Sequence, residues 1–367
     1  MIAREDEVSV VSVVIPCHNI GDYVVDCVMS ALDQSYEWLD VVAVDDGSTD
    51  RTGRLLDELE QTDHRLSVVH RANGGLGAAR NAGVAASSGE FLFFLDGDDI
   101  LPLDAIERMV DAATKSGSDM VSGVAVRFDA TRQWRSGLYG SIFEAEPVGT
   151  HIFLEPCLVF DQMACSKLIR RDFWDHHQLE FPVETLFEDA LVITQAHCLA
   201  SGVDLIDTPT YRWRLRPESI TSDRFRPSSV AQRFAVVKSV DDYLRLHAPN
   251  AVWRAHGEKV YAHDLRMYAR LAVDAGPDEF AEFMSSSRPV IGSMHGDART
   301  SVSSIARLLG QYLADGNAVG ARACALMISE GDQRSIGRIV SGLVDPWPRS
   351  PIIGLRVAIA ALRSVFD

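Results

Sequence analysis

The chain has 367 residues, of which 47% are hydrophobic and 24% are charged, and its formal net charge at pH 7 is −17. This length suits one large domain and a smaller one, and the negative charge excludes nonspecific binding to nucleic acid, which needs a cationic surface. Residues 1–7 lack the cationic start and apolar core of a signal peptide, and no apolar run approaches the roughly 20 residues that span a bilayer. These properties predict a cytoplasmic protein.

The cysteines are scattered along the chain, and no two of them form a C-x-x-C pair. This spacing predicts neither a zinc knuckle nor a dithiol redox centre. We expect free thiols, as is usual in a reducing compartment.

The first hundred residues alternate between strand and helix patterns. Apolar and β-branched runs predict the strands, and apolar residues at helical spacing predict the helices between them. The expected strands are 8–15, 41–44, 66–70 and 91–95, and the expected helices are 22–32, 51–60 and 78–87. Pro16 is expected to stop the first strand. Elements that alternate at this spacing predict an α/β fold with a mostly parallel sheet flanked by helices.

The rest of the chain changes character at Arg226–Pro227. Before this point the signals are mixed, with strands expected at 119–127 and 204–211 and a helix at 190–200. After it only helical periodicity remains, at 228–247, 253–274, 302–314, 318–330 and 335–344. We therefore predict an α/β domain over 1–226 and an all-α C-terminal domain over 227–367.

The apolar run 91–95 ends abruptly in three acids, Asp96, Asp98 and Asp99. A buried strand of an α/β protein delivers functional groups at its carboxyl end, and Gly97 lets the backbone turn or approach a ligand closely there. Carboxylates packed this tightly repel one another unless a cation or ligand hydroxyls lie between them. A hard divalent ion, Mn²⁺ or Mg²⁺, fits this pattern. An acidic loop after a core strand explains the D-x-D alone about equally well.

A second pair of acids, Asp45 and Asp46, follows the second expected strand. With the glycine turn and the hydroxyls that come next, this pair makes a polar pocket above the sheet. A carboxylate there accepts hydrogen bonds from a base N–H or from ribose hydroxyls. The alternative is a capped helix start, which explains Ser48 or Asp50 as the N-cap but leaves the two acids unexplained.

The segment 73–83 is rich in glycine and resembles a dinucleotide-binding loop at first sight. It fails that test, because Ala79 and Arg80 stand where the third small residue should be and because the segment follows the third strand. We interpret it as a flexible loop leading into a helix that carries Arg80 towards a nucleotide. A plain glycine-rich connection would explain the glycines but not the arginine.

Two later segments carry charge at positions suited to chemistry. Glu188 and Asp189 precede an apolar helix, so Asp189 is either a general base or an ordinary helix N-cap. In the segment 211–216, three arginines alternate with bulky residues. Arginines at alternate positions of a strand share one face, which suits a diphosphate. A solvated basic edge strand is the alternative.

In this order the motifs closely resemble those of the family 2 glycosyltransferases, which have the GT-A fold. The resemblance covers residues 8–221 and departs from the usual family pattern slightly, at Cys17-His18 and at Gly97. Each motif alone is weak, but seven of them in family order are specific. They are VSVVIPCHN, VDDGSTD, NGGLGAARNAG, GEFLFFLDGDD, ACSKLIRRDFW, FEDALV and YRWRLRPESIT.

The resemblance implies an inverting transferase that moves a sugar from a nucleotide-activated donor, most often a UDP-sugar. The acceptor would be a hydroxyl of a cell-surface glycan, a polymer or a lipid-linked molecule, and Mn²⁺ or Mg²⁺ would lie on the diphosphate. Displacement at the anomeric carbon needs a base opposite the leaving group. A cation and arginines would stabilise the departing diphosphate.

The resemblance also implies roles for individual residues. Asp189 matches the family's catalytic base, and Glu188 beside it is expected to be catalytic as well. Asp98 would bind the metal. Asp96 would bind the ribose or the metal. The donor site would be formed by Pro16, Asn19, Asp45, Asp46, Asn73, Arg80 and Asp96. Lys167, and Arg212 or Arg214, would reach the phosphates or the acceptor.

Two other classes of protein stay open. A metal-dependent phosphohydrolase also places D-x-D after a buried strand, but this chain lacks the Ser or Thr expected beside a nucleophilic Asp, and FED and YRWRLR would be unexplained. A non-catalytic nucleotide-sugar-binding module would be free to lose Asp98 and Asp189, and both are present.

The segment 351–366 is largely apolar, and basic residues cluster within it and before it. These are Arg334, Arg338, Arg349, Arg356 and Arg363. One interpretation is a peripheral contact with an anionic membrane. We favour a core helix or the interface of a homo-oligomer, because amphipathic stripes usually pack in cores. The domain 227–367 would accordingly serve acceptor, oligomer or membrane contact.

Overall fold

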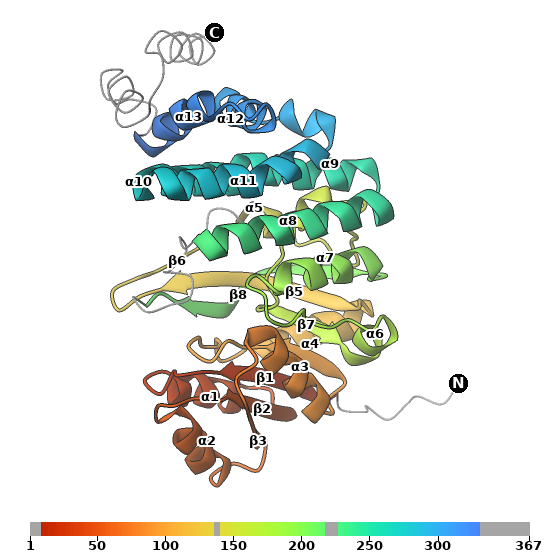
Figure 1. Ribbon diagram of the computed structural model, residues 1–367. Coiled ribbons are helices and arrows are strands. Elements are labelled where there is room, and N and C mark those ends of the chain that lie inside the picture. The colour runs from red at the N-terminus through yellow and green to blue at the C-terminus, as the bar shows by residue number, and fades with distance from the viewer. Residues whose placement is uncertain (1–8, 136–139, 217–226, 331–367) are drawn as a thin grey trace. The chain divides into compact units, whose positions relative to one another are not determined.

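The computed structural model describes residues 9–135, 140–216 and 227–330 (Figure 1). Contacts divide the chain into two compact units, Met1–Ser219 and Ile220–Asp367. The helix predicted at 335–344 and the basic segment 351–366 lie outside the described residues.

An eight-stranded sheet forms the centre of the first unit (Figure 1). Its strands are β1 (Val11–Cys17), β2 (Leu39–Asp46), β3 (Leu66–Arg71), β4 (Phe91–Phe94), β5 (Met120–Phe128), β6 (Gln133–Arg135), β7 (Lys167–Arg170) and β8 (Val203–Arg214). The order is β3-β2-β1-β4-β7-β5-β6, with β8 beside β5. The strands β3, β2, β1 and β4 run parallel, as do β5 and β8, whereas β7 and β6 are antiparallel to their neighbours. The predicted α/β fold with a mostly parallel sheet is confirmed.

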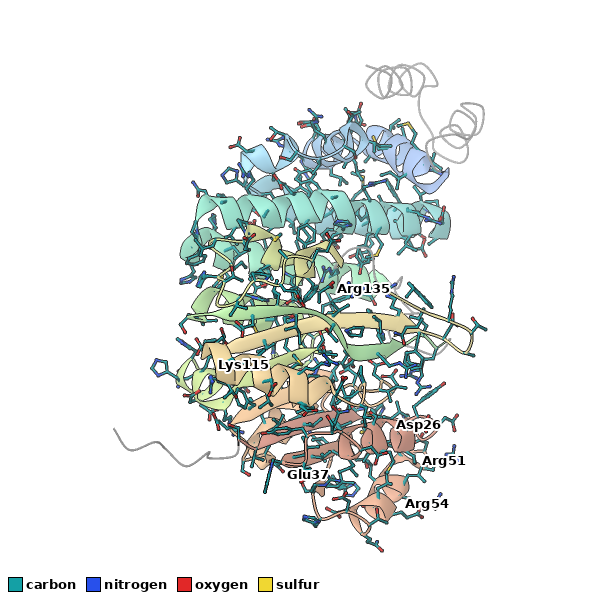
Figure 2. All side chains as sticks on the ribbon, turned by 180° about the vertical axis from the view of Figure 1, so that it is seen from behind. Asp26, Glu37, Arg51, Arg54, Lys115 and Arg135 are labelled. Carbon is teal, nitrogen blue, oxygen red and sulfur yellow. The ribbon has the colours of Figure 1, made fainter. Side chains whose placement is uncertain are left out.

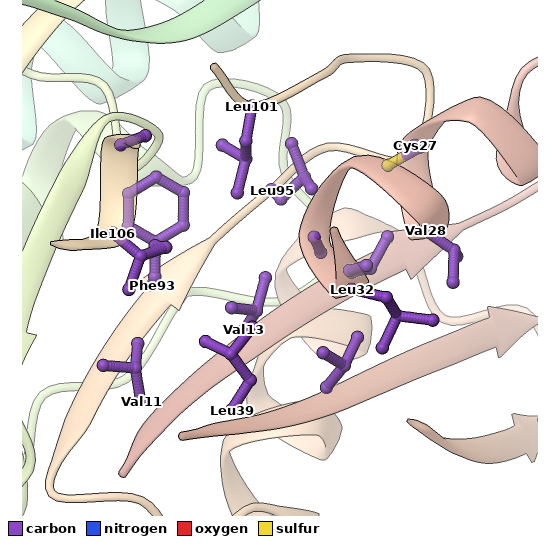
Figure 3. Packing of buried hydrophobic residues seen from close by; sticks show 14 of the residues in the cluster. Val11, Val13, Cys27, Val28, Leu32, Leu39, Phe93, Leu95, Leu101 and Ile106 are labelled. Atoms are coloured by element: carbon purple, nitrogen blue, oxygen red, sulfur yellow. The ribbon is translucent and has the colours of Figure 1, made fainter. Parts of the chain in front are cut away.

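Helices cover both faces of this sheet. They are α1 (Val24–Leu32), α2 (Thr52–Glu60), α3 (Leu76–Ala86), α4 (Ala105–Ser116), α5 (Gly140–Phe143), α6 (Arg171–His176) and α7 (Asp189–Leu199). On one face, Val11, Val13 and Phe93 share a buried core with residues of α1, α2 and α4 (Figure 3). On the other face α3 lies so close that a Cβ at Gly83 would overlap Cγ1 of Val14. Side chains of a strand alternate between faces, so a sheet covered on both sides needs the continuous apolar runs seen in the sequence.

The first strand extends past the proline expected to stop it. β1 runs to Cys17, and Pro16 pairs with Val44 of β2. Pairing with β4 ends at Val14, so Pro16 lies where β1 has a partner on one side only. A residue without an N–H is tolerated at such a position.

The helix α4 and the strand β7 lie in the stretch of mixed signals and were not predicted. α4 buries Ile106, Met109, Val110 and Ala113 at helical spacing, so its periodicity was available in the sequence. β7 has only four residues and inserts antiparallel between β4 and β5. A strand this short carries little periodic signal of its own.

The described part of the second unit is helical, as the periodicity predicts. Its helices are α8 (Pro227–His247), α9 (Asn250–Lys259), α10 (Leu265–Ala275), α11 (Pro277–Ser293), α12 (Ser304–Ala314) and α13 (Ala318–Glu330). The single helix predicted at 253–274 is α9 and α10 joined by a π-helical turn at Val260–Asp264. Phe234, Tyr268 and Phe283 are buried in the core of this unit.

None of the helices in the described ranges is long and apolar enough to cross a membrane. All six cysteines are free, as expected, and five of them are buried.

Candidate active site

The carboxyl ends of β1, β2 and β4 meet at one edge of the sheet. From β1 the chain adds β2 and β3 on one side, and it then crosses back to add β4 on the other side of β1. Open α/β sheets bind ligands at the strand where the order reverses in this way. The loop after β1 carries Asn19, the end of β2 carries Asp46, and the loop after β4 carries Asp96 and Asp98. The fold therefore brings residues from three distant motifs to one place.

Gly97 allows the loops after β1 and β4 to touch. A Cβ at this position would lie 2.9 Å from the carbonyl oxygen of Pro16 and 3.1 Å from Sγ of Cys17. A larger residue would therefore push the neighbouring acids, Asp96 and Asp98, away from β1. Pro16 thus shapes the site through its backbone.

His18 joins the loops that follow β1, β2 and β3. Its Nδ1 lies 2.9 Å from the carbonyl oxygen of Asp46; because a carbonyl only accepts, Nδ1 carries the proton. Nε2 then accepts hydrogen bonds from the side-chain amides of Asn19 and Asn73, at 3.1 and 3.2 Å. Sequence reasoning assigned the two asparagines to the site and missed the histidine, although it stands beside Asn19.

Asp46 holds the glycine-rich loop. Its carboxylate accepts hydrogen bonds from the backbone N–H groups of Gly74, at 3.0 Å, and Gly75, at 2.8 Å. Nε of Arg71 lies 3.2 Å from the same carboxylate. The side chain of Asp46 is almost fully buried, so this end of the site is built from backbone donors that the fold fixes in place.

Asp45 turns away from this loop and organises the start of α2. It accepts a hydrogen bond from the N–H of Ser48, at 3.0 Å, and lies 3.0 Å from Nδ1 of His70. Asp50 accepts from the N–H of Thr52, the first residue of α2, at 2.9 Å. The described contacts of Asp45 therefore stabilise the turn between β2 and α2.

Two of the three acids after β4 pair with arginines. Oδ1 of Asp96 lies 2.7 Å from Nη2 of Arg80, and Oδ2 of Asp98 lies 2.5 Å from Nε of Arg216. Burial raises the pKa of Asp98 above its usual range, and the negative charge of Asp96 adds to this effect, while Arg216 opposes it. The cluster therefore needs positive charge to stay ionised.

Asp99 links this loop to β8. It accepts hydrogen bonds from the hydroxyl of Tyr211, at 2.5 Å, and from the N–H of Arg214, at 2.7 Å. Burial holds its pKa well above the usual range, and the charges of Asp98 and Asp96 raise it further. Asp99 and Tyr211 were not assigned to the site, and their role is to fix the end of β8 beside the acids.

Arg80 connects the acids after β4 with the FED motif. It is 2% exposed, and its Nη1 donates to Oε1 of Glu188 while its Nη2 donates to Asp96. Burial raises the pKa of Glu188 to about 7 against the effect of Arg80, and the charge of Asp189 contributes to the rise. Asp189 is the first residue of α7, where a negative charge is favoured by the helix dipole, and the N-cap position belongs to Glu188.

Lys167 is not brought to this place. Its Nζ lies 2.6 Å from Oδ1 of Asp161. The other oxygen of this carboxylate, Oδ2, accepts a hydrogen bond from the hydroxyl of Ser122 and lies 3.3 Å from Nε2 of His197. The lysine is 0% exposed, so its ammonium is not open to a phosphate in this structure. The pair of Lys167 with Asp161 could not be predicted from the sequence, because Asp161 lies in an irregular stretch without periodic pattern.

Arg212 and Arg214 of β8, and Arg216 two residues after the strand, stack on aromatic rings. Arg212 and Arg214 lie 4.7 and 4.9 Å from the ring centroid of Phe128. Arg214 and Arg216 each lie 5.3 Å from the ring centroid of Tyr23. Nε of Arg214 also donates to the carbonyl of Asp98 at 2.8 Å. Sequence reasoning proposed the first two arginines, and the same alternation would have indicated the third, Arg216.

The acids after β4 suit a hard cation by their chemistry, since Asp96 and Asp98 offer carboxylate oxygens. Within the described ranges, no three acids, histidines or cysteines gather into a complete metal site.

A surface hollow of about 420 Å³ lies beside these residues. It is bordered by Asn19 and Tyr23 and by Arg51, which pairs with Asp22 at the rim. Arg51 and the nearby Asp26 stand at the surface of this part of the unit (Figure 2).

The model of the family "Glycosyl transferase family 2" matches residues 12–177. A putative glycosyltransferase of Bacillus subtilis (strain 168), EpsH, is 28% identical over 257 residues, which cover 69% of this chain and 72% of that protein. These similarities span the motifs after β1, β2, β3 and β4.

Solved structures share the fold at low sequence identity. TarS 1–349 of S. aureus in complex with UDP-GlcNAc is 19% identical and superposes with a TM-score of 0.74, covering 88% of this chain and 92% of that one. The mannosyltransferase PcManGT from Pyrobaculum calidifontis, in complex with GDP-Man and Mn²⁺, is 16% identical with a TM-score of 0.50, covering 89% of this chain and 88% of that one. Residues 12–177 therefore match the family 2 glycosyltransferases, and the chain has a GT-A fold.

Proposed function

We propose that this chain transfers a sugar, with inversion, from a UDP-activated donor to a hydroxyl of a glycan, polymer or lipid-linked acceptor. The observation that carries the proposal is the arrangement around Arg80. Its Nη2 contacts Asp96, a donor-side acid, and its Nη1 contacts Glu188, which precedes the proposed base Asp189. The donor acid and the proposed base thus come from separate segments, which suits inversion, because a base must act opposite the leaving group.

The nucleotide end would be formed by Asn19, Asp46 and Asn73. The carboxylate of Asp46 suits the N–H of a uracil, and the amides suit its carbonyl oxygens. Asp45 would support this end indirectly through the turn before α2. The choice of UDP is supported by TarS, which shares the fold and was captured with UDP-GlcNAc.

The diphosphate end would be formed by Asp96, Asp98, Arg214 and Arg216. Bound Mn²⁺ or Mg²⁺ at the two acids would neutralise charge on the departing diphosphate, and PcManGT, which was captured with Mn²⁺, supports this choice of ion. The guanidinium groups would hold the same oxygens. Asp189 would take the proton from the acceptor hydroxyl as that oxygen attacks the anomeric carbon.

The test is a screen of UDP-sugars with Mn²⁺ that measures release of UDP. We expect release with one sugar, and a loss of at least about 100-fold in Asp98→Ala and in Asp189→Asn, in line with the contribution of a general base or a metal ligand. Asp111→Ala is the matched control, since Asp111 pairs with Lys115 on the exposed face of α4. It should leave the rate within about twofold.

The products separate the remaining interpretations. Release of UMP and a sugar phosphate would indicate a phosphohydrolase instead. Tight UDP binding without turnover of any sugar, with or without acceptors, would indicate a binding module. In either case the proposed transfer would be wrong.

A further inference from the structure

We propose that Arg80 is a positioning residue that ties the donor acid Asp96 to Glu188, and that Glu188 is its partner and transfers no proton. Binding of the donor and placement of Asp189 would then be coupled through one side chain. The inference rests on the proposed function, because it takes Asp96 as a donor contact and Asp189 as the base.

The geometry of Arg80 is that of a bridge. Nη2 lies 2.7 Å from Oδ1 of Asp96, and Nη1 donates to Oε1 of Glu188. The two carboxylates come from segments that are far apart in the chain, the loop after β4 and the start of α7. A planar guanidinium with two forked amino groups spans two acids at a fixed separation, which the single ammonium of a lysine does not.

Aromatic packing holds the guanidinium of Arg80 in place. The guanidinium lies 5.2 Å from the ring centroid of Phe181, and this ring contacts Phe94 and Trp174 at centroid distances of 5.0 and 5.5 Å. The side chain of Asn81, the residue after Arg80, donates to the carbonyl of Phe181 at 2.8 Å and accepts from its N–H at 2.9 Å. The arginine and the segment beneath it therefore move together.

The same helix fixes the chain that leads to the FED motif. A Cβ at Gly77 would overlap the carbonyl oxygen of Pro182, so α3 packs directly on the start of the segment 182–188. Phe187, which precedes Glu188 in this segment, has a φ of 62°, and this conformation costs free energy for a residue other than glycine. Such a backbone needs outside contacts to persist, and the contact of Arg80 with Glu188 is one of them.

Charge explains why Glu188 depends on this contact. One buried guanidinium faces Asp96 and Glu188, with Asp189 contributing further negative charge. If Arg80 is removed, the buried Glu188 and the partly exposed Asp96 lose their counter-charge, and Glu188 must take up a proton or turn away. Because Asp189 is the next residue and begins α7, a displaced Glu188 displaces Asp189.

The test is a double-mutant cycle with Arg80→Lys and Glu188→Ala. We expect Glu188→Ala to lower kcat about 30-fold with UDP affinity within about threefold, and Arg80→Lys to lower both. The double variant should lose no more than Arg80→Lys alone, because both changes break one unit. Glu188→Gln keeps an oxygen that accepts from Arg80, so it should restore kcat to within about fivefold of the wild type.

Arg170→Lys is the matched control. Arg170 also stacks on a phenylalanine, Phe91, at 4.8 Å, and pairs with a carboxylate, Glu90, at 3.1 Å. It lies at the opposite end of β4 from Asp96, so its substitution should change neither kcat nor UDP affinity by more than about twofold.

Amide hydrogen exchange separates this inference from the proposed function. Exchange of the peptide 182–189 should rise at least about tenfold in Arg80→Lys and Glu188→Ala and stay unchanged in Arg170→Lys, whatever the substrate is. Unchanged exchange, losses that multiply in the double variant, or a Glu188→Gln variant as inactive as Asp189→Asn would each overturn the bridge. A wild type that releases no UDP from any sugar would overturn only the proposed function, since exchange would still decide the bridge.

Discussion

The two ends of the candidate site hold their acids in different ways. At the nucleotide end, Asp46 accepts hydrogen bonds from the backbone N–H groups of Gly74 and Gly75. At the diphosphate end, Asp96 and Asp98 pair with arginine side chains. Backbone donors are fixed by the fold, whereas a side-chain guanidinium exchanges one anion for another. We infer that the first end is preorganised and that, at the second, the pair of Arg216 with Asp98 rearranges when a cation and a diphosphate bind.

The largest expected effect comes from breaking the preorganised end. Asp46→Ala removes the acceptor of two backbone N–H groups and the counter-charge of Arg71. We expect UDP to bind about 100-fold more weakly, which corresponds to about 2.7 kcal/mol and lies in the range for losing buried hydrogen-bond partners. Isothermal titration calorimetry measures this change.

Asp40→Ala is the control for this prediction. Asp40 also lies on β2 and also accepts from a backbone N–H, that of Ser88, at 2.9 Å, but it lies at the other end of the strand. Its substitution should change stability without changing UDP affinity. Equal losses of affinity in both variants would mean that Asp46 acts only through the stability of the sheet.

A second variant probes the end that must rearrange. Arg216 pairs with Asp98 at 2.5 Å and is largely buried, so we expect it to compete with a cation for this carboxylate. In Arg216→Gln we expect Mn²⁺ to bind about tenfold more tightly without nucleotide, a difference of about 1.4 kcal/mol. With UDP present the affinity should fall, because the guanidinium no longer holds the diphosphate. Electron paramagnetic resonance of free Mn²⁺ measures both values.

Arg135→Gln serves as the comparison for Arg216. Arg135 pairs with Asp207 at 2.5 Å and is more exposed (Figure 2), so its loss should leave Mn²⁺ binding unchanged. If Arg216→Gln bound Mn²⁺ no better than the wild type, the ion pair with Asp98 would not compete with a cation, and the contrast between the two ends would weaken.

The sequence predicts the preorganised end better than the other one, for a physical reason. Buried parallel strands are recognised in the sequence by continuous apolar runs, and the carboxyl end of β2 places Asp46 without knowledge of any side-chain contact. The partners of charged side chains depend on tertiary packing between distant segments. Lys167 illustrates this, because its local sequence suggests a phosphate ligand and its actual partner, Asp161, lies in an irregular stretch.

The smallest expected effect concerns the turn that supports the nucleotide end. His70 lies 2.8 Å from Oδ1 of Asp57 and 3.0 Å from Oδ2 of Asp45, and these two acids raise the pKa of His70. The stabilisation is therefore fully present below the ordinary histidine pKa of about 6.5 and is lost as the pH rises through the raised value. The imidazole is half exposed, so we expect only about 0.5 kcal/mol.

Thermal unfolding of His70→Asn at low salt, at pH 6 and pH 9, measures this contribution. The variant should be less stable than the wild type at pH 6 and nearly equal to it at pH 9. His64→Asn is the control, because His64 is 96% exposed and its Nδ1 lies 3.9 Å from Oδ1 of Asp63. A difference that does not change with pH would mean that Asp45 is held by the N–H of Ser48 and not by a charged imidazole. The turn at the nucleotide end would then rest on backbone donors alone, which would strengthen its contrast with the arginine-held acids.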